Sequence, residues 1–175
     1  MLNFETLNDA RLLKALRDAE EWLSDFTRRT PPRWISMLGV SGAGKTFLAK
    51  QLWTLASHAA NWSRCDFIHK PIYWPRFVRD LKAGDAYGLR DDLARWPVLF
   101  IDDIFADRDA TGFSTDELNM ILGCRMGKWT ILTANLDIEK IAAIETRISS
   151  RMNRDGNRVV NFGSLDFATR KDSKR

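Results

Sequence analysis

Residues 39–46 read G-V-S-G-A-G-K-T and match the phosphate-binding loop pattern G-x-x-x-x-G-K-[ST]. Glycines in such a loop bring backbone N–H groups close to phosphate oxygens, and the following helix N-terminus adds a partial positive charge. We expect Lys45 to reach the β- and γ-phosphates of a nucleotide and the Thr46 hydroxyl to bind Mg²⁺. The other residues expected to line the phosphates are Gly39, Val40, Ser41, Gly42, Ala43 and Gly44.

Two carboxylates end an apolar run in the stretch V-L-F-I-D-D at 98–103. Such a run is typical of a strand buried on both faces of a parallel sheet, and open α/β folds bind ligands at the carboxyl edge of that sheet. We therefore predict that Asp102 binds the water shell of Mg²⁺ and that Asp103 orients or activates an attacking water. Two aspartates could also simply cap a strand, but their position about 55 residues after a phosphate-binding loop favours catalysis.

Two further segments could complete a hydrolytic site. The run I-L-T-A-N ends in Asn135, which would lie near the γ-phosphate if its strand lies between the two strands already described; asparagine is also a common turn residue. Arg147 and Arg151 are four residues apart and therefore share one helix face. A rigid guanidinium can stabilise charge on a transferring phosphoryl group, although a salt-bridged surface helix has the same spacing.

The elements that must position these residues alternate between strands and helices. Strands are expected at 34–38, 65–68, 98–101, 129–133 and 158–162. Helices are expected at 12–25, from the phosphate-binding loop to about 59, and at 72–81, 86–95, 114–126, 138–144 and 146–153, with S-T-D-E at 114–117 as a capping box. This alternation predicts an α/β fold, a parallel five-stranded sheet with helices on both faces.

Length and composition are those of a single globular α/β domain. The chain has 175 residues, of which 45% are hydrophobic and 29% charged, and it lacks an apolar run that could span a membrane. We expect an amphipathic helix within 1–30, which packs on the domain or docks on another protein, an ATPase domain at 31–170 and a basic tail at 171–175. Because no signal peptide is visible, we expect a cytoplasmic protein whose Cys65 and Cys124 are reduced, buried thiols.

A net charge of +4 is compatible with an ordinary solvated surface and with a nucleic-acid partner. Tyr73 and Trp74 stand among the basic residues Lys70, Arg76, Arg79 and Lys82. Aromatic and basic residues in this mixture suit the stacking of single-stranded bases beside phosphate contacts. They could equally be an aromatic pair packed under a loop.

The order of these elements resembles the AAA+ ATPases of the DnaA/DnaC/IstB group over about residues 8–170. The most specific stretch is F-I-D-D-I-F-A-D, followed by C-R-M-G-K-W and T-I-L-T-A-N-L, which is similar to the core of DnaC-type helicase loaders. R-I-S-S-R-M and R-V-V-N-F resemble the arginine-finger box and final strand of that group.

This resemblance implies ATP binding at 39–46, a Walker B pair at Asp102 and Asp103, and a sensor 1 residue at Asn135. It also implies that Arg151 is an arginine finger acting on a neighbouring subunit, with Arg147 as its companion, and that Arg170 is a sensor-2-like residue. About a dozen residues follow Phe162, so no full helical lid is expected. About 30 residues precede the first strand, where DnaC-type loaders usually carry a separate helicase-binding domain.

The sequence thus predicts a bacterial or phage-encoded ATPase that binds ATP/ADP and Mg²⁺, self-assembles, and acts as a helicase loader on single-stranded DNA and a replicative helicase. Three alternatives remain: an IstB-like ATPase that assists DNA transposition, a small-molecule P-loop kinase, and an ATP-binding module without hydrolysis. The kinase is disfavoured because no lid of clustered arginines and no acceptor pocket are visible in the sequence.

Overall fold

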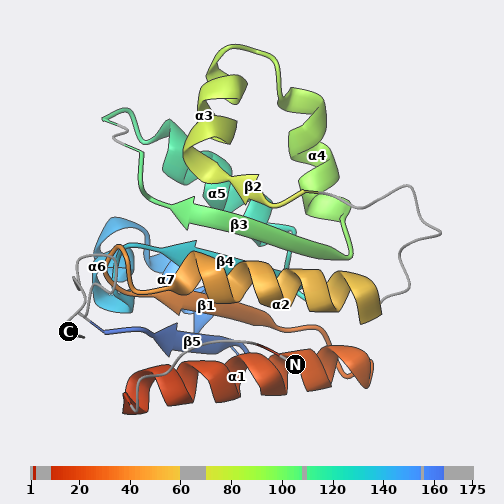
Figure 1. The fold of residues 1–175 in the computed structure, drawn as a ribbon. Helices are drawn as coiled ribbons and strands as arrows, with labels where there is room; N and C mark the ends of the chain where they lie inside the picture. Colours follow the sequence, from red (N-terminus) through yellow and green to blue (C-terminus); the bar gives the residue numbers. More distant parts are fainter. Residues whose placement is uncertain (1, 3–8, 60–69, 108–109, 155, 164–175) are drawn as a thin grey trace, which may run out of the picture.

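The computed structural model describes residues 2, 9–59, 70–107, 110–154 and 156–163. Five parallel strands form one sheet in the order β2-β3-β4-β1-β5 (Figure 1). Their bounds are β1 Trp34–Leu38, β2 Ile72–Tyr73, β3 Val98–Ile104, β4 Trp129–Ala134 and β5 Arg158–Asn161. The predicted parallel α/β sheet is confirmed, and β4 lies between β1 and β3, as the placement of Asn135 requires.

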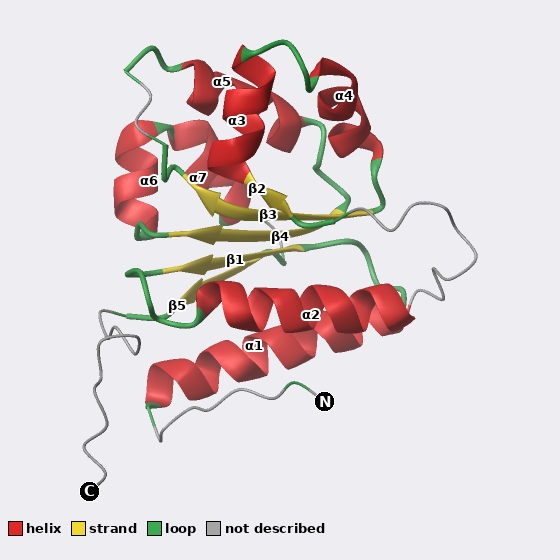
Figure 2. Ribbon diagram, turned by 45° about the horizontal axis from the view of Figure 1, so that its top comes forward, coloured by secondary structure: helices red, strands yellow, loops and turns green. Residues whose placement is uncertain are grey.

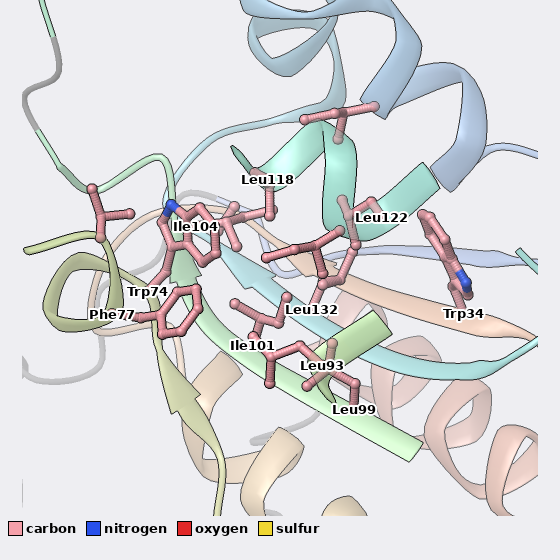
Figure 3. Packing of buried hydrophobic residues seen from close by; sticks show 14 of the residues in the cluster. Trp34, Trp74, Phe77, Leu93, Leu99, Ile101, Ile104, Leu118, Leu122 and Leu132 are labelled. Atoms are coloured by element: carbon pink, nitrogen blue, oxygen red, sulfur yellow. The ribbon is translucent and has the colours of Figure 1, made fainter. Parts of the chain in front are cut away.

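Helices cover both faces of the sheet (Figure 2). On one face lie α1 Ala10–Thr27 and α2 Lys45–Ala59. On the other lie α3 Trp74–Lys82, α4 Tyr87–Arg95, α5 Phe113–Gly123, α6 Ile138–Ile144 and α7 Thr146–Met152. Each face has its own buried apolar cluster, and Figure 3 shows the one that α3, α4 and α5 complete against β3 and β4.

Helix α1 packs on its own domain, as one of the two sequence readings expected. It buries Leu12, Ala15, Ala19 and Trp22 against α2 and the sheet. The Trp22 ring lies edge-on to Trp129 of β4, with 5.0 Å between ring centroids. Burying four such side chains stabilises the helix by several kcal/mol, roughly 1.5–3 for each large one, so its apolar face is not available for a partner.

Three local predictions are wrong or incomplete. The helix expected at 72–81 begins only at Trp74, because Ile72 and Tyr73 pair with β3 to form β2. The expected capping box at 114–117 does not form. Helix α5 begins at Phe113, and its N-cap residue is Gly112, which has a φ of 77° and makes no side-chain capping hydrogen bond. Cys124 is exposed, not buried. Cys65 and the strand expected at 65–68 lie outside the described residues.

A buried arginine closes the edge of the sheet that lies opposite the phosphate-binding loop. Arg125 is fully buried, and its guanidinium donates to the backbone oxygens of Leu93 at 3.1 Å, Trp129 at 2.5 Å and Trp96, and to Thr130 Oγ1 at 3.2 Å. Burial lowers the pKa of Arg125 to about 10. Arg125 directly follows α5, and its side chain therefore connects the end of α4 to the start of β4.

Candidate nucleotide-binding site

The phosphate-binding loop connects the end of β1 to the start of α2 and is fixed at its first residue. Gly39 has a φ of 136°, and a Cβ there would lie 3.0 Å from the backbone oxygen of Gly163. Val40 N donates to that same oxygen at 3.3 Å. Only glycine suits both the conformation and the close approach, so the loop is held against the segment that follows β5.

Lys45 is the first residue of α2, and its side chain contacts the backbone of the loop. Its Nζ donates to the backbone oxygen of Val40 at 2.5 Å and to Asn135 Oδ1 at 2.9 Å, and the residue is buried. Burial lowers the pKa of Lys45, while the charges of Asp103 and Asp102 act in the opposite direction. A buried ammonium whose hydrogen-bond acceptors are neutral oxygens is suited to receive phosphate oxygens.

Thr46 and Asp102 lie together, as the sequence predicted. Thr46 Oγ1 donates to Asp102 Oδ1 at 2.8 Å, and Thr133 Oγ1 donates to the same carboxylate oxygen at 2.7 Å. Mg²⁺ in nucleotide sites keeps several waters and takes one or two protein oxygens plus phosphate oxygens. The Thr46 hydroxyl and Asp102 carboxylate fit that donor set, although the described residues contain no metal-binding group of three or more His, Cys, Asp or Glu side chains.

A β-bulge in β3 sets the directions of the Asp102 and Asp103 side chains. Ile101 pairs with Leu132 and Ile104 pairs with Ala134, so Asp102 and Asp103 together stand opposite Thr133 alone. Asp103 has a φ of 63°, which residues other than glycine seldom adopt. Its backbone N–H donates to Thr133 Oγ1 at 2.8 Å. Bulges of this kind redirect side chains next to functional sites.

Asp103 is hydrogen-bonded to the predicted sensor residue. Asn135 Nδ2 donates to Asp103 Oδ1 at 2.5 Å, while Asn135 Oδ1 accepts from Lys45. Burial, followed by the negative charge of Asp102, raises the pKa of Asp103; Lys45 and the bond from Asn135 act in the opposite direction. The structure therefore brings Lys45, Asp102, Asp103 and Asn135 into one constellation at the carboxyl ends of β1, β3 and β4.

A cavity of about 420 Å³ lies over this constellation. Of the loop, Ser41, Gly42, Gly44, Lys45 and Thr46 line it, whereas the predicted loop residues Gly39, Val40 and Ala43 do not. The polar residues just described line it too, together with Phe47 and Tyr73 at 57% and 51% exposure. Thr133 and Phe47 were missed by the sequence reasoning. The T-A-N segment contained Thr133, but its role depends on strand register, which no local pattern in the sequence gives.

Neither arginine of α7 lines this cavity. Arg151 is held on α5 by Asn119, and Arg147 is 72% exposed with its Nε 3.4 Å from Glu145 Oε1. Arg170 lies outside the described residues. In one chain, the structure thus brings together the loop, Asp102, Asp103 and Asn135, but not the two arginines.

Of the two aromatic residues predicted to stack on single-stranded bases, the prediction is wrong for Trp74. Trp74 is fully buried, donates its indole N–H to Ser114 Oγ at 2.9 Å and packs on Phe77 with 5.6 Å between ring centroids (Figure 3). No base can stack on it. Tyr73 is exposed at the nucleotide cavity, and the basic residues Lys70, Arg76, Arg79 and Lys82 are all exposed.

Comparison with known proteins gave one family. The model of the bacterial DnaA ATPase domain matches residues 23–157. A search of curated protein sequences gave no match. Among the described helices, none is long and apolar enough to cross a membrane.

Solved structures share the fold. A crystal structure of DnaI is 24% identical, with a TM-score of 0.65 and coverage of 94% of this chain and 88% of that chain. A DnaC helicase loader is 17% identical, with a TM-score of 0.66 and coverage of 88% and 91%. Replication initiator DnaA bound to AMPPCP and single-stranded DNA is 22% identical, with a TM-score of 0.62 and coverage of 92% and 47%. This chain therefore spans about half of that DnaA chain.

Proposed function

The chain belongs to the bacterial DnaA ATPase domain family, and we propose that it hydrolyses ATP as a DnaC-like helicase loader in bacterial or phage DNA replication. The observation that carries the proposal is the unbroken series of hydrogen bonds from Lys45 through Asn135 to Asp103, beside the Thr46–Asp102 contact. This series joins the group that binds phosphate to the group that would activate water.

Each residue of the constellation has a separate task. The loop amides and Lys45 would bind the β- and γ-phosphates, and Thr46 and Asp102 would hold Mg²⁺, which supplies charge neutralisation when bound. Asp103 would accept a proton from the attacking water, and Asn135 would hold that water and the Asp103 carboxylate in register. The raised pKa of Asp103 brings this carboxylate closer to the pKa range of an effective general base.

The two α7 arginines fit a site shared between subunits. Since neither lines the cavity of its own chain, we propose that Arg151, with Arg147 beside it, completes the cavity of a neighbouring copy. An arginine finger supplied in this way is worth about 10³–10⁵ in rate. Hydrolysis by a single chain would then be slow and would rise with self-assembly.

For nucleic acid, we propose that the exposed side of α3 contacts single-stranded DNA through its cations. Arg76 and Arg79 share Asp80 as a partner at 3.7 and 3.6 Å, so the helix carries net positive charge. The structurally similar DnaA was solved with single-stranded DNA, and the similar DnaC is a helicase loader. These likenesses support DNA and a replicative helicase as partners in the cytoplasm.

Family membership supports this function over a small-molecule kinase. Phosphate release by the purified protein distinguishes hydrolysis from ATP binding alone. If wild type and Asp103→Asn release phosphate equally slowly at every protein concentration, the protein is only an ATP-binding module.

The partner is tested by affinity capture from the native host in the presence of ATP. We expect a replicative helicase to be recovered with the wild-type chain and not with Lys45→Ala. Recovery of a transposase in its place would instead identify an IstB-like ATPase of transposition.

A further inference from the structure

Arg151 is a fixed cation at the surface of α7. Its Nη1 donates to the backbone oxygen of Asn119 at 3.3 Å and also to the side-chain Oδ1 of Asn119. The guanidinium lies over Gly123, where an added Cβ would be 3.4 Å from Nη2. Both contacts belong to α5. A single side chain of α5, Asn119, therefore helps to set the direction in which the Arg151 guanidinium points.

The acceptors of Arg151 are neutral amide oxygens. Within 9–59, 70–107, 110–154 and 156–163, no carboxylate forms an ion pair with Arg151, whereas Arg147 lies 3.4 Å from Glu145 and Arg158 has three acidic partners. Asn119 thus restrains the guanidinium without neutralising its charge. A cation that is already oriented stabilises a developing phosphoryl charge without the cost of reorganisation at the moment of reaction.

We propose that Asn119 is a positioning residue that orients Arg151 toward the phosphates of a nucleotide bound to a second copy of this chain. The proposal rests on the function proposed above and deepens it. A guanidinium is planar and presents its N–H groups in a fixed fork. With Nη1 committed to Asn119, the remaining N–H groups keep one direction, and the side chain does not have to be ordered again when two chains meet.

The variant Asn119→Asp distinguishes a role in orienting Arg151 from a purely structural contact between α5 and α7. The variant is nearly the same size but places a carboxylate against Arg151, which strengthens the hold and neutralises the charge. If the contact only anchors α7 to α5, the variant keeps full turnover. If Asn119 orients Arg151 without neutralising its charge, turnover at high protein concentration falls at least about tenfold. The KM for ATP then changes little, because the loop and Lys45 that bind ATP are unchanged. We expect an unchanged or higher melting temperature.

Asn119→Ala is a second test of the same contact, which still applies if Asn119→Asp fails to fold. It frees Arg151 to sample other rotamers, and we expect a smaller loss of turnover with the KM for ATP unchanged. Arg17→Gln on α1 is the matched control for Asn119→Asp. It lowers the net charge by the same amount, at an exposed site on the opposite face of the sheet.

The outcomes distinguish this inference from the proposed function. Wild-type turnover that does not rise with protein concentration, or a fully active Arg151→Ala variant, would overturn both. A wild type stimulated by concentration, together with an inactive Arg151→Ala and a fully active Asn119→Asp or Asn119→Ala, would overturn only the role of Asn119.

Discussion

At the scale of single residues, Asp103 combines an uncommon backbone conformation with a perturbed carboxyl group. Its φ of 63° lies in the left-handed region, which residues other than glycine seldom adopt, and burial, followed by the charge of Asp102, raises its pKa. A carboxyl whose folded pKa is raised lowers the stability of the native state at pH values above that pKa, and this cost disappears below the unfolded pKa. Asparagine tolerates the left-handed region better than most residues and carries no charge.

We therefore expect Asp103→Asn to gain stability while losing activity. At neutral pH its melting temperature should exceed that of wild type, and the difference should shrink on acidification to about pH 4. ATP turnover should fall by at least about 100-fold because the proposed general base is missing. Thermal melts at several pH values and a phosphate-release assay measure both. A lower melting temperature, or turnover equal to wild type, contradicts this account; Asp91→Asn, exposed on α4, is the control.

At the scale of elements, β4 is positioned from both of its ends. Arg125 fixes its start through backbone oxygens, and at its other end Thr133 bridges the Asp102 carboxylate and the Asp103 amide. Since Asn135 directly follows β4, a shift of the strand would displace Asn135 and the bulge together. Helix α3 is held in a similar way by Trp74, so that its basic residues have a fixed backbone beneath them.

Replacing Arg125 should destabilise the fold strongly. Arg125→Met keeps much of the volume but leaves several buried backbone oxygens without donors, at about 1–3 kcal/mol for each group left unsatisfied. We expect a loss of about 3 kcal/mol or more in the free energy of unfolding, measured in urea. Arg125→Lys should not restore it, because an ammonium cannot reproduce the planar fork. A loss as small as that of Arg95→Met, which changes an exposed arginine of α4, would show that the buried bonds matter little.

The basic side of α3 should contribute to single-stranded DNA binding through charge. We expect Arg79→Ala to weaken binding and to reduce the slope of log K against log salt by about 0.7, the value for one phosphate contact on a single strand. Trp74→Phe should leave DNA affinity unchanged in the folded protein, since the indole is buried. Fluorescence anisotropy across a salt series provides the slopes. An effect of Arg79→Ala no larger than that of Arg17→Ala would exclude α3 as the contact.

At the scale of the whole molecule, sequence patterns succeeded where the chemistry is local and failed where it depends on packing. The loop at 39–46 and the Asp102–Asp103 pair were predictable, because a short motif and a buried strand fix their places. Thr133 and Asn119 were not, because their contacts join segments about 30 residues apart. Trp74 was misread because an aromatic residue among cations has the same pattern whether it faces solvent or the core.

The central claim is that one active site is built from two chains, and a mixing experiment tests it most directly. Lys45→Ala lacks a working phosphate loop but keeps Arg151, whereas Arg151→Ala keeps the loop and lacks the arginine. Each variant alone should be nearly inactive at all concentrations. In an equimolar mixture, about a quarter of the contacts between neighbouring copies would pair an intact loop with an intact arginine. We expect ATP turnover to reappear on mixing at roughly that fraction of the wild-type rate; a mixture as inactive as its components would contradict the claim.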